Sequence, residues 1–323
     1  MTRKKLDYEV GIMFDTALNK AASKSKWVHW LINDNKHAAR STLNFLHTCF
    51  ANIPEAKHPG ICQKLERNDK DGVEATICEL VAHELLWRLE LSPEFEFVSV
   101  DELKPDLSFA TEGKRFLTEV YLTHSPSKTY RDFKNRMEGE AWDTSKPDES
   151  RAHKIEDVLS EKISKYKCLD MPLVVFVFLG DHRGLSESDV ETALFGMTAE
   201  EVSLEKRFPE SVSREYIPVG GLLLPDDDGN NPYCNLSAVV SCDWFDTLNR
   251  QDRGKRLHCL VLHNWGATEA LPIDAFKLFP QIIWSQSEPG IWKPRLTKNR
   301  TIVAKFTNDG GIEYREYTPN TAW

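Results

Sequence analysis

The first 70 residues place apolar side chains at helical intervals. Two such groups are Trp27, Trp30, Leu31 and Leu43, Leu46, Cys49, Phe50. After a loop at 54–60, residues 74–89 continue with the pattern of an amphipathic helix. Its buried stripe is Ile77, Leu80, Val81, Leu85 and Leu89. The pattern therefore predicts a helical N-terminal region over residues 1–70, followed by a long helix that opens the central part of the chain.

Alternation with period two replaces the helical pattern after this helix. Phe95 and Phe97 point one way, and strands are expected from 107–109 and over 116–122. Glu112-Gly-Lys114 separates these two strands and is typical of a tight hairpin turn. The chain thus predicts an antiparallel hairpin directly behind the long helix.

The rest of the central region returns to alternating helices and strands. A helix is expected over 155–166, with a second one over 186–195. Between them, residues 172–179 are continuously apolar, which indicates a central strand covered on both faces. The order α-β-β-β-α-β-α across 74–195 predicts an α/β core with a mixed sheet flanked by helices. Further strands are expected at 218–224, 235–242, 257–263 and 301–306.

These elements divide the chain into three regions. We expect a helical N-terminal region at 1–70, a core at 71–197 and an α/β C-terminal extension at 198–323. The extension can be continuous with the core. At 323 residues the chain has room for about two domains.

Composition excludes several protein classes. The chain has 41 Lys and Arg against 50 Asp and Glu, a formal charge of −9, so it is no general polycation. Its longest apolar stretch, 172–180, is too short to span a membrane, and the basic N-terminus lacks a following apolar segment. Seven scattered cysteines without a C-x-x-C pair indicate a reducing compartment and argue against structural zinc. We therefore expect a cytoplasmic globular protein with no membrane partner.

Common catalytic motifs are missing from the sequence. There is no phosphate-binding glycine loop, nucleophile elbow or dinucleotide-binding loop. His83-Glu84 begins like a zinc-protease motif, but Trp87 stands where the second histidine is needed. His258 and His263 are five apart on an expected strand, which places them on opposite faces. A different set of residues must carry any chemistry.

Three carboxylates form the one candidate functional site that the sequence indicates. Asp106 follows Pro105 at the start of a strand, and Glu119 lies in the next strand of the hairpin. We expect the hairpin to bring both to one end of the sheet, with Glu79 of the long helix nearby. Oxygen ligands of this kind suit Mg²⁺ or Mn²⁺, and such an ion can activate water and stabilise charge on a phosphate. The alternatives are that Glu119 is an acid at an exposed edge of the sheet and that Glu79 lies on a solvated face of its helix.

These residues resemble a known family. Glu79, Pro105-Asp106 and Glu119-Val-Tyr121 are similar to the motif of the PD-(D/E)XK nuclease superfamily. The likeness covers residues 79–196, a bit over a third of the chain. It implies a restriction-endonuclease-like core and Mg²⁺-dependent (or Mn²⁺-dependent) cleavage of phosphodiesters. It also implies Asp106 and Glu119 as metal ligands, the Val120 carbonyl as a further one, and a role in restriction or anti-phage defence.

The chain departs from the family at the motif lysine, which should lie two residues after Glu119. Tyr121 stands there, and a phenol carries no positive charge at neutral pH. Lys162 and Tyr166, four apart on an expected helix, resemble the Q-x-x-x-Y element of exonuclease-type branches. The likeness makes Lys162 a replacement for the missing lysine. The alternative is an ordinary surface lysine, and Lys114 in the hairpin turn is a weaker substitute.

The polar segment 124–150 is a candidate for contact with a phosphate backbone. Its basic side chains are Lys128, Arg131, Lys134 and Arg136. The alternative is a solvated helix.

A nuclease acting on DNA is the preferred function. The competing interpretation is a catalytically degenerate nuclease fold that binds nucleic acid or a protein partner, and a hydrolase using acid–base chemistry stays open. The terminal regions can serve in specificity, in a homodimer or in docking a partner subunit.

Overall fold

The computed structural model describes most of the chain. The described residues are 3–34, 37–95, 103–123, 151–166, 171–179, 187–198, 218–219, 221–223, 231–243, 256–288, 291–297, 301–307 and 312–317. The basic residues expected to contact nucleic acid, Lys128, Arg131, Lys134 and Arg136, lie outside them.

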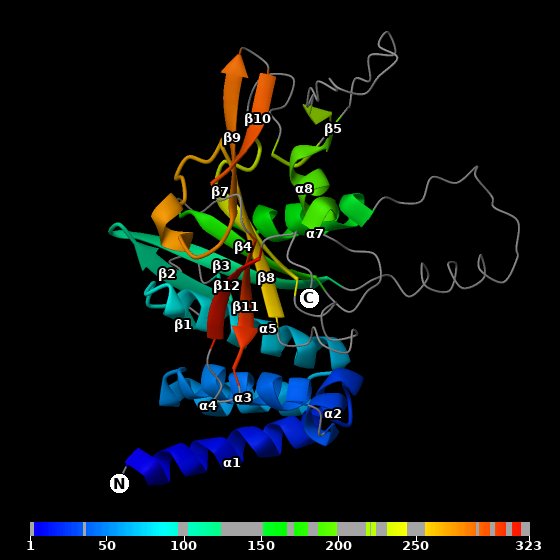
Figure 1. The fold of residues 1–323 in the computed structure, drawn as a ribbon, viewed down its shortest axis with the longest axis vertical. Helices are drawn as coiled ribbons and strands as arrows, with labels where there is room; N and C mark the ends of the chain where they lie inside the picture. Colours follow the sequence, from blue (N-terminus) through cyan, green and yellow to red (C-terminus); the bar gives the residue numbers. More distant parts are fainter. Residues whose placement is uncertain are drawn as a thin grey trace, which may run out of the picture.

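Helices make up the N-terminal part of the molecule. They are α1 (Arg3–Ala21), α2 (Lys26–Asn33), α3 (His37–Ala51), α4 (His58–Arg67) and α5 (Lys70–Arg88), with a short 3₁₀ turn η1 (Glu55–Lys57) before α4. Polar caps set two of the boundaries. The Ser25 hydroxyl accepts a hydrogen bond from the Val28 N–H of α2, and the Asp69 carboxylate accepts one from the Gly72 N–H of α5. Figure 1 shows α1 to α4 stacked beneath α5, which lies between them and the sheet.

A mixed sheet of ten strands forms the centre. Its main path runs β1 (Glu94–Phe95), β2 (Leu107–Thr111), β3 (Lys114–Thr123), β4 (Leu173–Leu179), β7 (Leu236–Asp243), β8 (Arg256–His263), β11 (Thr301–Phe306) and β12 (Ile312–Tyr317). The hairpin of β9 (Gln281–Glu288) and β10 (Ile291–Leu296) joins at β8. Strands β3, β4 and β7 are parallel, whereas β2 and β3 pair in antiparallel fashion. A separate pair, β5 (Met197–Thr198) and β6 (Pro218–Val219), lies outside this sheet.

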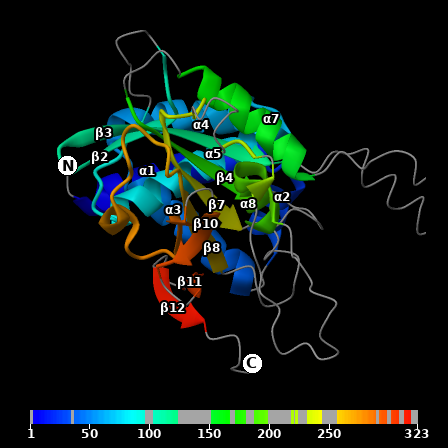
Figure 2. The ribbon, with the colours of Figure 1, turned by 90° about the horizontal axis from the view of Figure 1, so that it is seen from above.

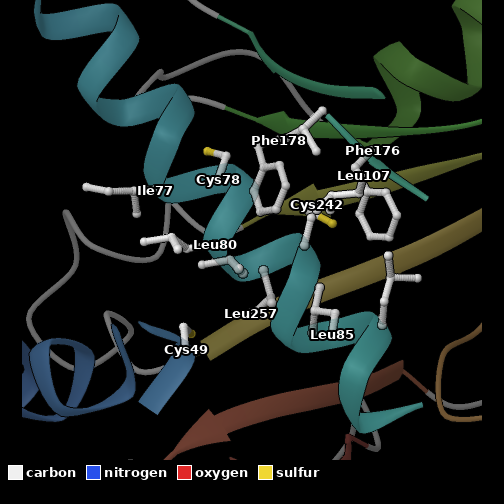
Figure 3. Packing of buried hydrophobic residues seen from close by; sticks show 14 of the residues in the cluster. Cys49, Ile77, Cys78, Leu80, Leu85, Leu107, Phe176, Phe178, Cys242 and Leu257 are labelled. Carbon is white, nitrogen blue, oxygen red and sulfur yellow. The ribbon is translucent and has the colours of Figure 1, made fainter. Parts of the chain in front are cut away.

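The two faces of the sheet have different covers. Helix α5 packs on one face, and the apolar cluster there extends from Phe14 to Phe279, so the N-terminal helices and the later strands share one core. Figure 3 shows Ile77, Leu80 and Leu85 of α5 over side chains of β4, β7 and β8. The other face carries α7 (Arg151–Ser164) and α8 (Glu187–Phe195), which bury a second apolar cluster. Figure 1 shows α7 above β3 and β4 and α5 below them, and Figure 2 looks down on these layers from the side of α7.

The expected architecture is confirmed at the level of class and element order. Between α5 and α8 the described elements follow the predicted order α-β-β-β-α-β-α, and the sheet is mixed with helices on both faces. All seven residues of β4 are buried, as its continuous apolar sequence predicts. Helix α5 is buried on more than the predicted stripe, because α3 and α4 cover the side turned away from the sheet.

Several sequence expectations are wrong in detail. The strand expected at 218–224 is reduced to Pro218–Val219, and the helix expected to reach Tyr166 ends at Ser164. Strands β9, β10 and β12 were not predicted. Alternation is weak in β9 and β10, whereas β12 alternates and was missed. None of the helices in the described part of the chain is long and apolar enough to cross a bilayer.

Candidate active site

The β2–β3 hairpin builds the first half of the candidate site. Its turn at Glu112 and Gly113 adopts positive φ angles of 51° and 76°, as expected for a two-residue turn that matches strand twist. Pairing begins with Leu107 opposite Thr118, so β2 has no residue opposite Val120. The Asp106 carboxylate takes that place: its Oδ2 accepts the Val120 N–H at 2.8 Å. The hairpin register therefore holds Asp106 beside Glu119.

Helix α7 supplies the second half. Glu119 lies on the sheet face that α7 covers, and its side chain is 6% exposed. Lys162 donates from Nζ to Glu119 Oε2 at 2.7 Å, and the Tyr166 hydroxyl donates to Oε1. Ile155, Leu159 and Ile163 seat the helix in the apolar cluster on that face. Because these three apolar side chains face the sheet, their packing determines which side of α7 contacts β3.

Helix α7 ends before Tyr166, yet both predicted residues reach Glu119. Tyr166 lies in a turn closed by its N–H, which donates to the Ile163 carbonyl at 3.0 Å. Its phenol is buried. The expectation that Lys162 and Tyr166 lie on one face of a helix is therefore wrong, because Tyr166 follows the end of α7. The two side chains nevertheless bind the same carboxylate.

Negative charge accumulates around Asp106. Burial raises its pKa from an ordinary 3.8 to about 7, and the charges of Glu119 and Glu79 act in the same direction. The Val120 N–H and the Lys162 ammonium oppose this rise without cancelling it. Asp106 consequently holds its proton close to neutrality, which is unusual for an aspartate and typical of a functional site.

The three other ionisable groups have defined charge states at neutral pH. Burial would lower the pKa of Lys162, but the charge and hydrogen bond of Glu119, together with Asp106, raise it, so the ammonium stays protonated. Burial raises the pKa of Tyr121, with Lys162 acting against it. Burial and then Glu119 raise the pKa of Tyr166. Both phenols are therefore neutral, and Lys162 provides the positive charge beside Glu119.

Glu79 approaches Asp106 from the opposite layer. It belongs to α5, and its carboxylate accepts a hydrogen bond from Lys64 Nζ of α4 at 3.0 Å. Its charge contributes to the raised pKa of Asp106. Sequence analysis missed Lys64, and no local pattern could have revealed it, because the contact depends on how α4 packs against α5.

The remaining lysines of the sequence analysis lie elsewhere. Lys114, at the start of β3, forms an ion pair with Glu269. It is five residues from Glu119, which corresponds to roughly 16 Å along a strand. Lys165 lies 3.8 Å from Glu161 and is exposed. Neither contacts the carboxylates of the candidate site.

The candidate site offers oxygen donors for a hard cation but no complete cluster of metal-binding side chains. Within the described ranges, no three His, Cys, Asp or Glu side chains are grouped so as to hold a metal ion. Asp106, Glu119 and the Val120 carbonyl are nevertheless all oxygen donors, which is the ligand type that Mg²⁺ and Mn²⁺ prefer. A divalent cation would also relieve the repulsion that helps raise the pKa of Asp106. Each bonded carboxylate oxygen keeps a second lone pair, so the chemistry of the site fits such an ion.

Comparison with known proteins adds no further assignment. The chain matches no protein-family model, and neither a curated protein nor a solved structure is similar to it.

Proposed function

We propose that the protein is a metal-dependent phosphodiesterase acting on nucleic acid, with DNA as the favoured substrate. The observation that carries this proposal is the contact of Lys162 with Glu119 beside Asp106. Two adjacent carboxylates and one ammonium are the charged groups of the PD-(D/E)XK motif that the sequence resembles. Here the ammonium comes from a helix instead of the strand position of Tyr121.

Each residue has a distinct part in the proposed reaction. Asp106 and Glu119 would hold Mg²⁺ or Mn²⁺ together with the Val120 carbonyl, and Glu79 would add negative charge from α5. The bound ion supplies an activated water and stabilises charge on the phosphate. Lys162 places a fixed positive charge where the phosphate oxygens gain charge. Tyr166 orients Glu119 by donating to its other oxygen.

A second candidate is a nuclease fold that binds nucleic acid or a protein partner without cleaving it. Both oxygens of Glu119 already accept hydrogen bonds, one from Lys162 and one from Tyr166. A carboxylate satisfied by its own protein has less need of a metal. This feature favours the second candidate, whereas the charge accumulated at Asp106 favours the first.

One assay separates the two candidates. Purified protein is incubated with linear DNA, circular DNA and RNA, each with Mg²⁺, Mn²⁺ or excess EDTA, beside a Glu119→Gln variant. The proposal expects cleavage that needs the divalent ion and the glutamate. Cleavage of circular DNA would identify an endonuclease, and cleavage of linear DNA alone an exonuclease.

The contrary outcome is equally informative. A gel shift with DNA or RNA that persists in EDTA, with no cleavage under any condition, would support the binding protein. A role in restriction or anti-phage defence needs a separate test in cells: if the protein cleaves nucleic acid, we expect expression of the wild type, but not of Glu119→Gln, to lower phage yield.

A further inference from the structure

Two buried thiols face each other across neighbouring strands, on the face of the sheet opposite the one that carries Glu119. Cys242 of β7 pairs with Cys259 of β8 in the antiparallel register. Their sulfur atoms are 3.5 Å apart, and the residues are separated by 17 positions in the chain. The side chains are 0% and 1% exposed. Figure 3 shows Cys242 among the apolar side chains under α5.

The backbone at this pair suits a disulfide. Val261, two residues from Cys259 on β8, directs its N–H away from β7 and donates to the Pro280 carbonyl beside β9. Because backbone direction alternates along a strand, Cys259 turns its own polar groups the same way, and the cysteines form a non-hydrogen-bonded pair. In such pairs the Cα atoms are about 4.5 Å apart, within the range of about 4.4–6.8 Å seen for disulfides. The two sulfurs can bond after small rotations about χ1.

We propose that Cys242 and Cys259 are a redox modification site that forms a reversible cross-strand disulfide when the protein meets hydrogen peroxide. In the first step one thiol is oxidised by peroxide to a sulfenic acid, and one water is released. In the second step the other thiol attacks that sulfur, the S–S bond forms, and the sulfenic oxygen leaves as a second water. Two thiols lose two electrons in all, and one peroxide molecule is reduced to two waters.

Access for the oxidant comes from the end of the strand pair. Within the described residues, which leave out 244–255, one pair, Asp243 with His258, follows the cysteines in the β7–β8 ladder. Fraying of terminal pairs needs much less free energy than global unfolding, and peroxide is about as small as water.

The disulfide would fasten β7 to β8. Closing a loop of this length restricts the unfolded chain and stabilises the folded one. We expect the oxidised protein to melt roughly 5 °C higher than the reduced protein, from the usual effect of such a loop in a chain of this size. In a reducing compartment the pair would rest as thiols, as transient cytosolic disulfides do.

The test is peptide mapping of the full chain. Reduced wild-type protein is treated with hydrogen peroxide, its remaining thiols are alkylated in denaturant, and the protein is digested without reductant. The expected product is a disulfide-linked pair of peptides containing Cys242 and Cys259, which dithiothreitol separates again. The oxidised protein should also carry two fewer alkylated thiols than untreated protein. Free alkylation of both cysteines, or linkage only in protein unfolded before oxidation, would overturn the proposal.

Matched variants check the specificity of the linkage. Cys78→Ala removes another buried thiol and should leave both the linked peptides and the melting shift unchanged. Cys242→Ala should abolish both. If Cys242→Ala fails to fold, the peptide map of the wild type still decides the outcome, because it needs no variant. A map in which Cys242 is linked to any cysteine other than Cys259 would also contradict the proposal.

Discussion

Two buried glutamates show what separates a structural carboxylate from a candidate functional one. Glu84, in the contact of α5 with α3, is 0% exposed and accepts hydrogen bonds from Asn52 Nδ2 at 2.9 Å and Arg88 Nε at 2.6 Å. Glu119, in the contact of β3 with α7, is 6% exposed and accepts from Lys162 and Tyr166. Burial and hydrogen bonding are therefore alike in the two regions.

The difference lies in the neighbouring charges. Glu84 is matched with the Arg88 guanidinium in an i, i+4 pair. Glu119 is matched with Lys162, but a second carboxylate, Asp106, lies beside it, and burial together with the charges of Glu119 and Glu79 raises the pKa of Asp106. Accumulated like charge disfavours folding unless something else binds there. Satisfied hydrogen bonds alone thus say little about function, whereas an uncompensated excess of one charge points to a ligand.

The largest effect should come from removing a carboxylate of the candidate site. Asp106→Ala or Glu119→Gln should lower Mg²⁺-dependent cleavage by about 10³-fold or more, equivalent to about 4 kcal/mol, because a metal ligand is lost. Neither substitution should lower the unfolding free energy by more than about 1 kcal/mol, since the repulsion between the carboxylates falls. Cleavage kinetics and urea unfolding measure the two effects. Glu84→Gln is the control and should keep its activity; equal losses in all three would remove the distinction.

Glu84 should matter for stability instead. Glu84→Ala leaves the partly buried Arg88 guanidinium and the Asn52 amide without their acceptor, and should lower the unfolding free energy by about 3 kcal/mol. Urea unfolding followed by circular dichroism measures the change. A loss of unfolding free energy below about 1 kcal/mol would mean that the unpaired Arg88 guanidinium costs no more here than it would at the protein surface.

Lys162 should affect turnover more than stability. Lys162→Ala removes the positive charge beside Glu119 and should reduce kcat about 10²-fold, or about 2.7 kcal/mol, with little change in DNA affinity. Lys165→Ala is the matched control, because this exposed lysine pairs only loosely with Glu161. Full activity in Lys162→Ala would shift the proposal toward the binding protein.

A further expected effect is a change of stability with pH in metal-free protein. The folded state keeps a proton on Asp106 up to its pKa of about 7, whereas the unfolded chain releases it near the ordinary 3.8. Between these values the folded state binds more protons, so its stability falls as pH rises, by up to about 1.4 kcal/mol per unit, and levels off above pH 7.

Unfolding series at pH 4 to 8 can isolate this contribution. The wild type should show the slope, Asp106→Asn should lack that part of it, and Glu84→Gln should keep it. Added Mg²⁺ should flatten the slope in the wild type by favouring ionised Asp106. Identical slopes in wild type and Asp106→Asn would contradict the charge accumulation on which the comparison depends.

Local sequence patterns predicted much of this arrangement. Alternation of apolar residues on both sides of Glu112-Gly-Lys114 indicated the hairpin that carries Asp106 and Glu119, and the apolar run at 172–179 indicated β4. The absence of lysine at position 121 pointed to a replacement in the following helix. Strand β9 was missed because its sequence lacks regular alternation and its place follows from pairing with β8 and β10. Strand β12 was missed although it alternates and pairs with the adjacent β11.

The sequence by itself determined the elements from α5 to α8 and which residues can carry charge, because turns, caps and periodic apolar positions act over a few residues. Tertiary structure alone decided which charges meet. Lys162 is 43 residues from Glu119, and Lys64 is 15 residues from Glu79 on another helix. The apolar stripe that seats α7 sets the first contact, and the packing of α4 on α5 sets the second. The raised pKa of Asp106 follows from its burial and from the nearby charges of Glu119 and Glu79. Both depend on distances in the folded chain, which no local pattern encodes.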